Sequence, residues 1–233
     1  MDYRTLGRSG CVASSLCLGT MTFGVETDEA GSHEQLDRFV EAGGTLVDTA
    51  DVYGGGQSEE IIGRWFASRP ADVTDRVVLA TKGRFPMGDE PNSLGLSTRH
   101  LTRALDASLT RLGLDRVDLY QVHAFDPLTP LDETLRTLDG FIRAGKISYY
   151  GLSNFTGWQL TKTVHLAKRS GRRGSGDAAA AVQPDRARDR VGDRACRTGC
   201  GHGNAAVESL GRRMAVGQIQ PRRTSNRRHS AWR

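Results

Sequence analysis

Residues 1–168 show two alternating patterns of apolar and polar positions. Short runs of β-branched and aliphatic residues, such as Thr45–Val47 and Arg76–Lys82, are typical of buried parallel strands. Longer stretches with apolar residues three and four apart are typical of helices that bury one face. The two kinds of segment follow one another in turn, which predicts parallel βα units and an α/β fold.

The pattern predicts an N-terminal hairpin followed by five βα units. The hairpin is expected over residues 3–12, around the turn Gly7–Gly10. A closed barrel of parallel strands needs eight such units, so the chain is predicted to form an incomplete barrel. Strands are expected at 15–18, 45–47, 76–82, 117–123 and 147–152, and helices at 29–42, 58–66, 97–112, 131–144 and 156–166.

Three of the predicted strands end in residues that can carry chemistry. Asp48, Lys82 and His123 stand at these ends, and Tyr53 follows in the loop after Asp48. The carboxyl ends of all strands of a parallel barrel lie on one face, where active sites are built. We therefore expect these four side chains to converge.

Each of the four also has an ordinary structural interpretation. An Asp at a strand end is often a helix N-cap or a loop acceptor, and a Lys there is often solvated. His123 can be a hydrogen-bonded core residue, and Tyr53 a packing ring. It is less expected that four residues with unrelated structural roles would all stand at positions suited to an active site than that they form one shared site.

The pattern Asp48-x4-Tyr53, with Lys82 and His123, resembles the catalytic tetrad of the aldo-keto reductases. The resemblance covers about residues 2–168 and implies a TIM-type (β/α)8 barrel, here incomplete. Asp48–Gly54 and Gly151–Phe155 resemble two signature sequences of the family. Leu18–Met21 resembles its first barrel strand.

The resemblance implies reduction of an aldehyde or ketone to an alcohol with NADPH. Tyr53 would donate the proton, and a Lys82 ammonium would lower the phenol pKa from its usual value of about 10. Asp48 would fix Lys82 by pairing with it, and His123 would orient the carbonyl through a hydrogen bond.

The resemblance also implies a cofactor site in which Ser153 and Asn154 hold the nicotinamide carboxamide. No Gly-x-Gly-x-x-Gly follows the first strand, so a Rossmann fold is not expected. The run Gly54–Gly56 lacks the Lys-Ser/Thr of a phosphate loop and is interpreted as a flexible rim. The expected cofactor-binding residues are Gly19, Thr20, Met21, Asp48, Ser153 and Asn154.

Charge divides the chain into two parts. The formal net charge of +5 combines −5 for residues 1–168 with +10 for residues 169–233, and every basic residue after Lys168 is Arg. Aliphatic residues become rare after Lys168, and neither period continues. We therefore divide the chain into a barrel part, 1–168, and an Arg/Ala/Gly-rich tail, 169–233, that is expected to lack packed structure.

The tail can be a disordered basic extension or the product of a frameshift in a GC-rich gene. With a one-base forward shift, Ser175–Ala187 is compatible with PVTLQPQYNLIER, and Asn204–Ile219 with MLPWSPLGGGWLSGKY. Both strings resemble family strands six and seven. Met214 is encoded by ATG and the codon of Ala215 begins with G, so the shifted frame must read TGG here. This codon gives Trp, as the second string requires, and we therefore favour a frameshift near residues 168–175. Gln183 is then not equivalent to the family's strand-six Gln.

Other classes of function are less well supported. A non-catalytic binding protein on the same barrel is the alternative to a reductase, since fold alone does not fix function. The tail lacks the aromatic residues and motifs of a nucleic-acid binder. Cys196, Cys200 and His202 offer three metal ligands without a fourth, so no metal is expected.

The N-terminus has neither a basic region nor an apolar region of a signal peptide, and no run of residues is long enough to span a bilayer. The four cysteines form no disulfide-rich pattern. We expect a cytoplasmic protein that acts on a small carbonyl substrate without binding a membrane or a specific nucleic acid. The oligomeric state stays open.

Overall fold

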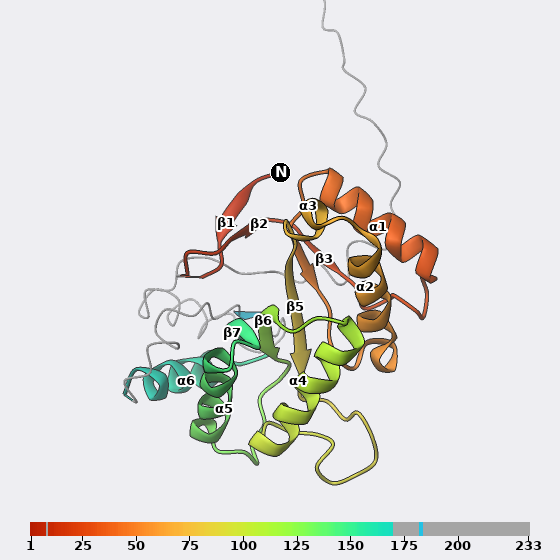
Figure 1. The fold of residues 1–233 in the computed structure, drawn as a ribbon. Coiled ribbons are helices and arrows are strands. Elements are labelled where there is room, and N and C mark those ends of the chain that lie inside the picture. Colours follow the sequence, from red (N-terminus) through yellow and green to blue (C-terminus); the bar gives the residue numbers. More distant parts are fainter. Residues whose placement is uncertain (8, 170–181, 184–233) are drawn as a thin grey trace, which may run out of the picture.

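The computed structural model describes residues 1–7, 9–169 and 182–183. The described part is built on a parallel sheet in which six strands follow one another in chain order, preceded by a two-stranded antiparallel hairpin (Figure 1). The hairpin is β1 (Tyr3–Thr5) and β2 (Val12–Ser14), and the sheet is β3 (Cys17–Gly19), β4 (Leu46–Asp48), β5 (Val78–Gly83), β6 (Val117–Val122), β7 (Ile147–Ser153) and β8 (Val182–Gln183).

The helices cover one face of this sheet. Each contacts the next along the sheet, so that α1 meets α2, α2 meets α4, α4 meets α5 and α5 meets α6 (Figure 1). This arrangement confirms the predicted incomplete βα barrel. The helices are α1 (Glu29–Glu41), α2 (Gln57–Ser68), the short α3 (Ala71–Thr74), α4 (Thr98–Leu112), α5 (Leu131–Arg143) and α6 (Gly157–Arg169), and a 3-10 turn, η1 (Tyr53–Gly56), precedes α2.

Local sequence signals set the helix ends. Ser97 caps α4 by accepting a hydrogen bond from the His100 N–H at 3.2 Å, and Gly113 ends the helix with φ 65°. Thr156 stands directly before α6, where a threonine can cap a helix, but its buried hydroxyl has no partner among the described residues. There the side chain of Gln159 accepts from the Thr156 N–H at 2.9 Å, which satisfies the backbone from the opposite direction.

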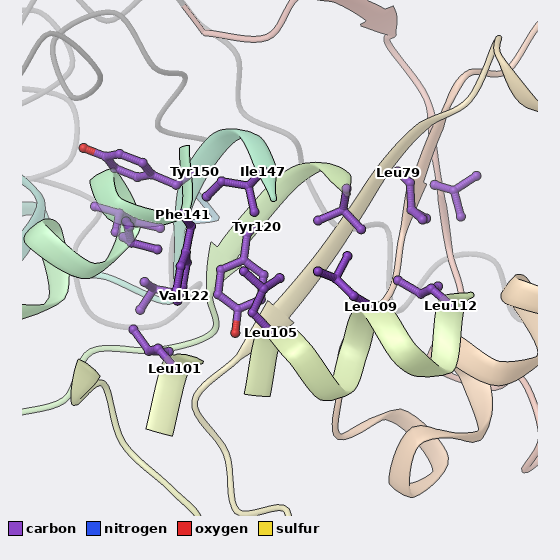
Figure 2. Packing of buried hydrophobic residues seen from close by; sticks show 14 of the residues in the cluster. Leu79, Leu101, Leu105, Leu109, Leu112, Tyr120, Val122, Phe141, Ile147 and Tyr150 are labelled. Atoms are coloured by element: carbon purple, nitrogen blue, oxygen red, sulfur yellow. The ribbon is translucent and has the colours of Figure 1, made fainter. Parts of the chain in front are cut away.

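The helix-facing side of the sheet holds the main hydrophobic core. Leucines at positions 101, 105, 109 and 112 form one stripe of α4, and all are buried. Figure 2 shows this stripe beside Tyr120 and Val122, two alternate residues of β6. The helical period of α4 therefore meets the strand period of β6 across a shared apolar layer.

The opposite side of the sheet holds a smaller apolar group near its amino end. Leu6, from the hairpin loop, packs with Ala80 of β5 and Leu119 of β6. The hairpin therefore covers the amino-terminal side of the strands. The carboxyl ends of the same strands are left for polar residues.

The structure adds one strand to the five that the sequence predicted. Val182–Gln183 pairs in parallel with β7, with Ser153 opposite Gln183. Such pairing uses only backbone N–H and C=O groups, so a segment without a recognisable strand pattern can form it. Arg169 and these two residues are the described part of the tail; the prediction that the rest is unstructured concerns residues outside the described ranges.

Candidate active site

Lys82 is the centre of a polar cluster at the carboxyl ends of β4, β5 and β6. Its ammonium donates to Asp48 Oδ2 at 2.6 Å, to the Thr49 carbonyl at 2.8 Å and to the Tyr53 hydroxyl at 3.2 Å. Only 1% of the Lys82 side chain is exposed, so this pairing takes place away from water. Three of the predicted residues are thus directly linked.

The charge state of Lys82 follows from these partners. Burial by itself would lower the pKa of Lys82, but the Asp48 carboxylate and then Tyr53 outweigh it, and the pKa is raised. Lys82 therefore stays an ammonium at physiological pH. A fixed positive charge lies 3.2 Å from the phenol oxygen of Tyr53.

His123 completes the predicted group directly after β6. Its ring lies edge-on to Tyr53, with centroids 5.9 Å apart, and 4.6 Å from the ring of Phe85. Burial, followed by the charges of Lys82 and Arg84, lowers the pKa of His123 to about 3. The imidazole is therefore neutral at physiological pH, with one N–H to donate.

The alternation of strand residues explains why Lys82 points into this site. On β5, Thr81 faces the helices, where its hydroxyl donates to Glu59 of α2 at 2.5 Å, so the adjacent Lys82 faces the other side. Tyr53 is placed by η1, in which Gly54 and Gly55 have φ of 59° and 65°. This left-handed backbone favours glycine, so the triglycine is an ordered turn.

Two residues of the site were missed by the sequence prediction. The Gln121 amide donates to Asp48 Oδ1 at 2.7 Å, so both Asp48 oxygens are hydrogen-bonded. Phe85 contacts the His123 ring. Gln121 precedes His123 by two strand positions and therefore shares its face, a signal that could have identified it.

A second buried polar group lies between this site and the helices. Arg111 pairs with the buried carboxylate of Glu59 at 2.7 Å. Burial, and next the charge of Glu59, raises the pKa of nearby Asp51 to about 7. Neither Asp51 oxygen has a well-oriented donor among the described residues, although the Val52 N–H acts to lower the pKa. The Asp51 carboxyl therefore holds its proton to a higher pH than an ordinary aspartate does.

The residues expected to bind a cofactor surround the polar cluster but differ in accessibility. Gly19 and Met21 are exposed, with 55% of Met21 accessible. Thr20 is buried, and its hydroxyl donates to the Asp48 carbonyl at 3.2 Å and accepts from Ser58 at 2.9 Å. The structure therefore gives the Thr20 hydroxyl a role in joining β3, β4 and α2.

Ser153 and Asn154 lie together at the end of β7. The Asn154 amide donates to the His123 carbonyl at 2.8 Å and to the Ser153 hydroxyl at 3.2 Å. Asn154 is exposed and has a left-handed backbone, with φ 55°. Ser153 is fully buried. No hydrogen bond of the described residues uses the amide oxygen of Asn154, so this exposed acceptor suits a ligand carboxamide.

Metal-binding clusters and membrane-spanning helices are absent from the described residues. These residues contain no cluster of His, Cys, Asp or Glu suited to a metal ion, and the predicted candidates Cys196, Cys200 and His202 lie outside them. None of the helices in the described ranges is long and apolar enough to cross a membrane.

Comparison with known proteins matches the chain to aldo/keto reductases and to proteins named as oxidoreductases. The family model "Aldo/keto reductase family" matches residues 15–184, which extends past the limit of about 168 inferred from the sequence. An uncharacterized oxidoreductase of Bacillus subtilis, YrpG, is 44% identical over 177 residues, covering 72% of this chain and 54% of the relative.

Two more distant relatives carry different names. A norsolorinic acid reductase of Aspergillus flavus is 37% identical over 183 residues, covering 72% of this chain and 47% of the relative. A probable voltage-gated potassium channel subunit beta of Oryza sativa is 37% identical over 170 residues, with 72% and 51% covered. The chain spans about half the length of the curated relatives it matches.

Proposed function

Because the chain belongs to the aldo/keto reductase family, we propose that it derives from an enzyme that reduces an aldehyde or ketone to an alcohol with NADPH. The observation that carries the proposal is the buried link from Asp48 to Lys82 to Tyr53, with distances of 2.6 and 3.2 Å. This link holds a cation against a phenol that has a proton to give. The free cysteines Cys11 and Cys17 suit a reducing cytoplasm, where we place the protein.

Each residue has a role that its contacts support. The Tyr53 hydroxyl gives its proton to the oxygen of the reduced carbonyl, and the Lys82 ammonium stabilises the phenolate that remains. Asp48 keeps Lys82 charged and in place. The neutral His123 ring donates to the carbonyl oxygen and aligns it with Tyr53, because its lowered pKa leaves it one N–H rather than a second positive charge.

The cofactor proposal rests on the donors and acceptors at the ends of β3 and β7. NADPH supplies the hydride when bound. Asn154 would offer its exposed amide oxygen to the cofactor carboxamide, with buried Ser153 holding the Asn154 amide nitrogen, and Gly19 and Met21 are exposed at the end of β3. Asp48 acts through Lys82, and buried Thr20 acts by fixing the end of β3.

We also propose that residues 169–233 are read out of frame. Proteins with this barrel commonly bind phosphate in the loops after strands seven and eight. The tail as written has no sequence counterpart of strand seven, whereas its shifted translation resembles strands six and seven. We therefore expect the 233-residue chain to be poorly soluble and to bind NADPH weakly. The frame-restored protein, residues 1–168 followed by the shifted translation, should bind NADPH, and sequencing codons 160–180 tests the shift directly.

Activity is tested in the frame-restored protein with Tyr53→Phe. Loss of a general acid typically costs 10²–10⁴-fold in rate, so the variant should lose most of its NADPH-dependent aldehyde reduction. Tyr149→Phe is the matched control, since Tyr149 lies on β7 and has no part in the polar cluster. Retention of more than about a third of wild-type turnover by Tyr53→Phe would show that Tyr53 is not the proton donor.

A non-catalytic binding role is the second candidate, favoured by the resemblance to a protein named as a probable potassium channel subunit. In that case the barrel would recognise a partner protein, and the polar cluster would serve as a ligand site. The same Tyr53→Phe comparison separates the two. Undetectable reduction by the frame-restored wild type, with NADPH still bound, would support the binding role.

A further inference from the structure

Arg84 lies two residues after Lys82, just beyond the end of β5. Its guanidinium carbon is 5.1 Å from the ring centre of Phe85, and that ring is 4.6 Å from the ring of His123. His123 in turn lies 5.9 Å from the ring of Tyr53. A cation, a phenyl ring, an imidazole and the proposed proton donor thus form a continuous row beside the site.

The guanidinium of Arg84 is poorly satisfied where it lies. Its Nε atom is buried and has no hydrogen-bond partner in the described part of the chain. One terminal nitrogen donates to the Phe125 carbonyl at a long 3.4 Å. None of the ion pairs formed within the described ranges includes Arg84.

Asp126 is the acidic residue near Arg84, but its oxygens are already occupied. Burial raises its pKa, and its hydrogen bonds, followed by the weaker effect of the Arg84 charge, lower that pKa overall. Asp126 accepts hydrogen bonds from the N–H groups of Leu96 and Leu128, both at 2.9 Å, and from the Thr129 hydroxyl at 2.7 Å. Asp126 therefore interacts electrostatically with Arg84 but forms no ion pair with it. An arginine has five N–H donors, and most of these are left for another acceptor.

We propose that Arg84 is a specificity-determining residue that selects carbonyl substrates carrying a carboxylate group. The inference rests on the proposed reductase function and adds a substrate class to it. The planar guanidinium can bind a carboxylate through two parallel hydrogen bonds. Phe85 supplies an apolar surface between this cation and His123, which suits a ring or chain linking the carboxylate to the carbonyl.

The opposing interpretation is that Arg84 only supports the loop that contains Phe125. A supporting role would affect all substrates alike and would appear as a loss of thermal stability. A recognition role changes the ratio of kcat/KM for charged and neutral substrates. The informative measurement is therefore this ratio, taken on substrates that differ in charge but little in shape.

The experiment compares 2-, 3- and 4-carboxybenzaldehyde with their methyl esters in the frame-restored protein and its variants. Arg84→Gln removes the charge, Arg84→Lys keeps it without the planar fork, and exposed Arg103→Gln controls for net charge. Hydrogen bonds to charged groups contribute about 1.5–3 kcal/mol, which corresponds to roughly 10- to 150-fold. We expect the acid-to-ester ratio for at least one isomer to fall by that factor in Arg84→Gln, less in Arg84→Lys, and not in Arg103→Gln.

Binding of the product alcohols provides a readout independent of turnover. Calorimetry with the (hydroxymethyl)benzoates and their methyl esters is performed on the 233-residue chain and on the frame-restored protein. Tighter binding of an acid by about tenfold or more, lost in Arg84→Gln, supports the proposal. An unchanged ratio in Arg84→Gln, or equal losses for acid and ester with a lowered Tm, overturns it. If neither aldehyde is reduced, the proposed function fails, and the binding ratio alone decides the role of Arg84.

Discussion

Thr81 and Lys82 are neighbours on β5, yet they belong to opposite faces of the sheet with different physical demands. Thr81 meets Glu59 beneath α2, on the side where Trp65, Leu105 and Tyr120 fill a continuous core. Lys82 faces the inside of the barrel, where contacts among charged and hydrogen-bonding groups dominate. The outer face is held by shape and apolar area, and the inner face by complementary charge.

This difference decides what each face tolerates. A buried ion pair costs desolvation that its attraction only partly returns, so replacing both partners by neutral groups is often nearly neutral for stability. A cavity in an apolar core has no such remedy. We therefore expect inner-face variants to lose activity while their stability can be restored by a second neutral substitution, and outer-face variants to lose stability without losing activity per folded molecule.

Lys82→Met should have the largest effect. Removing one member of the buried pair leaves Asp48 without its cation, at a cost of about 3–5 kcal/mol in the free energy of unfolding. The double variant Lys82→Met/Asp48→Asn should regain much of that stability while remaining inactive. Urea unfolding of the frame-restored protein measures the stability of the single and the double variant. Lys146→Met, which breaks an exposed pair with Asp106, is the control. Failure of the double variant to regain stability would contradict the contrast between the faces.

Leu105→Ala should cost about 2–5 kcal/mol in the free energy of unfolding, because Leu105 is fully buried in the outer core and leaves a cavity. The matched control is Leu128→Ala, since Leu128 is 88% exposed. Activity per folded molecule should be unchanged in both variants. Denaturant midpoints and specific activity measured on the same samples decide the point, and similar costs at the two positions would argue against this packing.

Asp51→Asn should reveal a pH-dependent cost at the boundary between the two faces. The folded pKa of Asp51 is raised to about 7, so the folded protein keeps a proton that the unfolded chain releases near pH 4. This contribution to stability is full below pH 4 and is lost as the pH rises to 7. Glu59, Arg111, Lys82 and Tyr120 are the charged or titratable groups that influence Asp51 or are influenced by it.

Asparagine removes that loss, so the stability of Asp51→Asn relative to wild type should grow by about 2–4 kcal/mol between pH 4 and pH 8. Urea unfolding at a series of pH values measures the difference. Asp89→Asn, at an exposed loop position, makes the same charge change as a control. A difference that does not vary with pH would mean that Asp51 is ionised throughout.

Gly83→Ala should have the smallest effect, about 1–3 kcal/mol, through overpacking. A Cβ at Gly83 would overlap the hydroxyl oxygen of Tyr120, across the β5–β6 pair. Tyr120→Phe removes that oxygen, so the double variant should recover most of the loss. Gly140→Ala, where a Cβ meets nothing within 4 Å, should not destabilise. The thermal midpoints of all four variants test this, and a lack of recovery would place the strain elsewhere.

The order and type of the main elements could be predicted because each carries a local signal. The leucine stripe of α4 and its Ser97 cap gave that helix within one residue. Asp48, Lys82 and His123 could be grouped because parallel strands bring their carboxyl ends to one side. The short α3 has no apolar period, and β8 has only two residues, so neither could be found this way.

Contacts between elements that are distant in the sequence could not be predicted from the periodicity of apolar and polar residues. The bond from Gln121 to Asp48 depends on the register of β4, β5 and β6, in which Asp48 lies opposite Ala80 and Gln121 lies opposite Lys82, two positions further along β5. The pairing of Glu59 with Arg111 depends on how α2 meets α4. Sequence periods tell which face a residue occupies, but not which residue of another element lies opposite.

The pairing of β8 with β7 has a consequence for how the barrel could be reassembled. The edge of β7 accepts Val182–Gln183 through backbone groups, so it selects by strand geometry rather than by side-chain identity. An edge of that kind could also be completed in trans. Residues 1–168 are then one half of a split protein, and a separately supplied fragment with the later strands becomes a means of switching its assembly on at will.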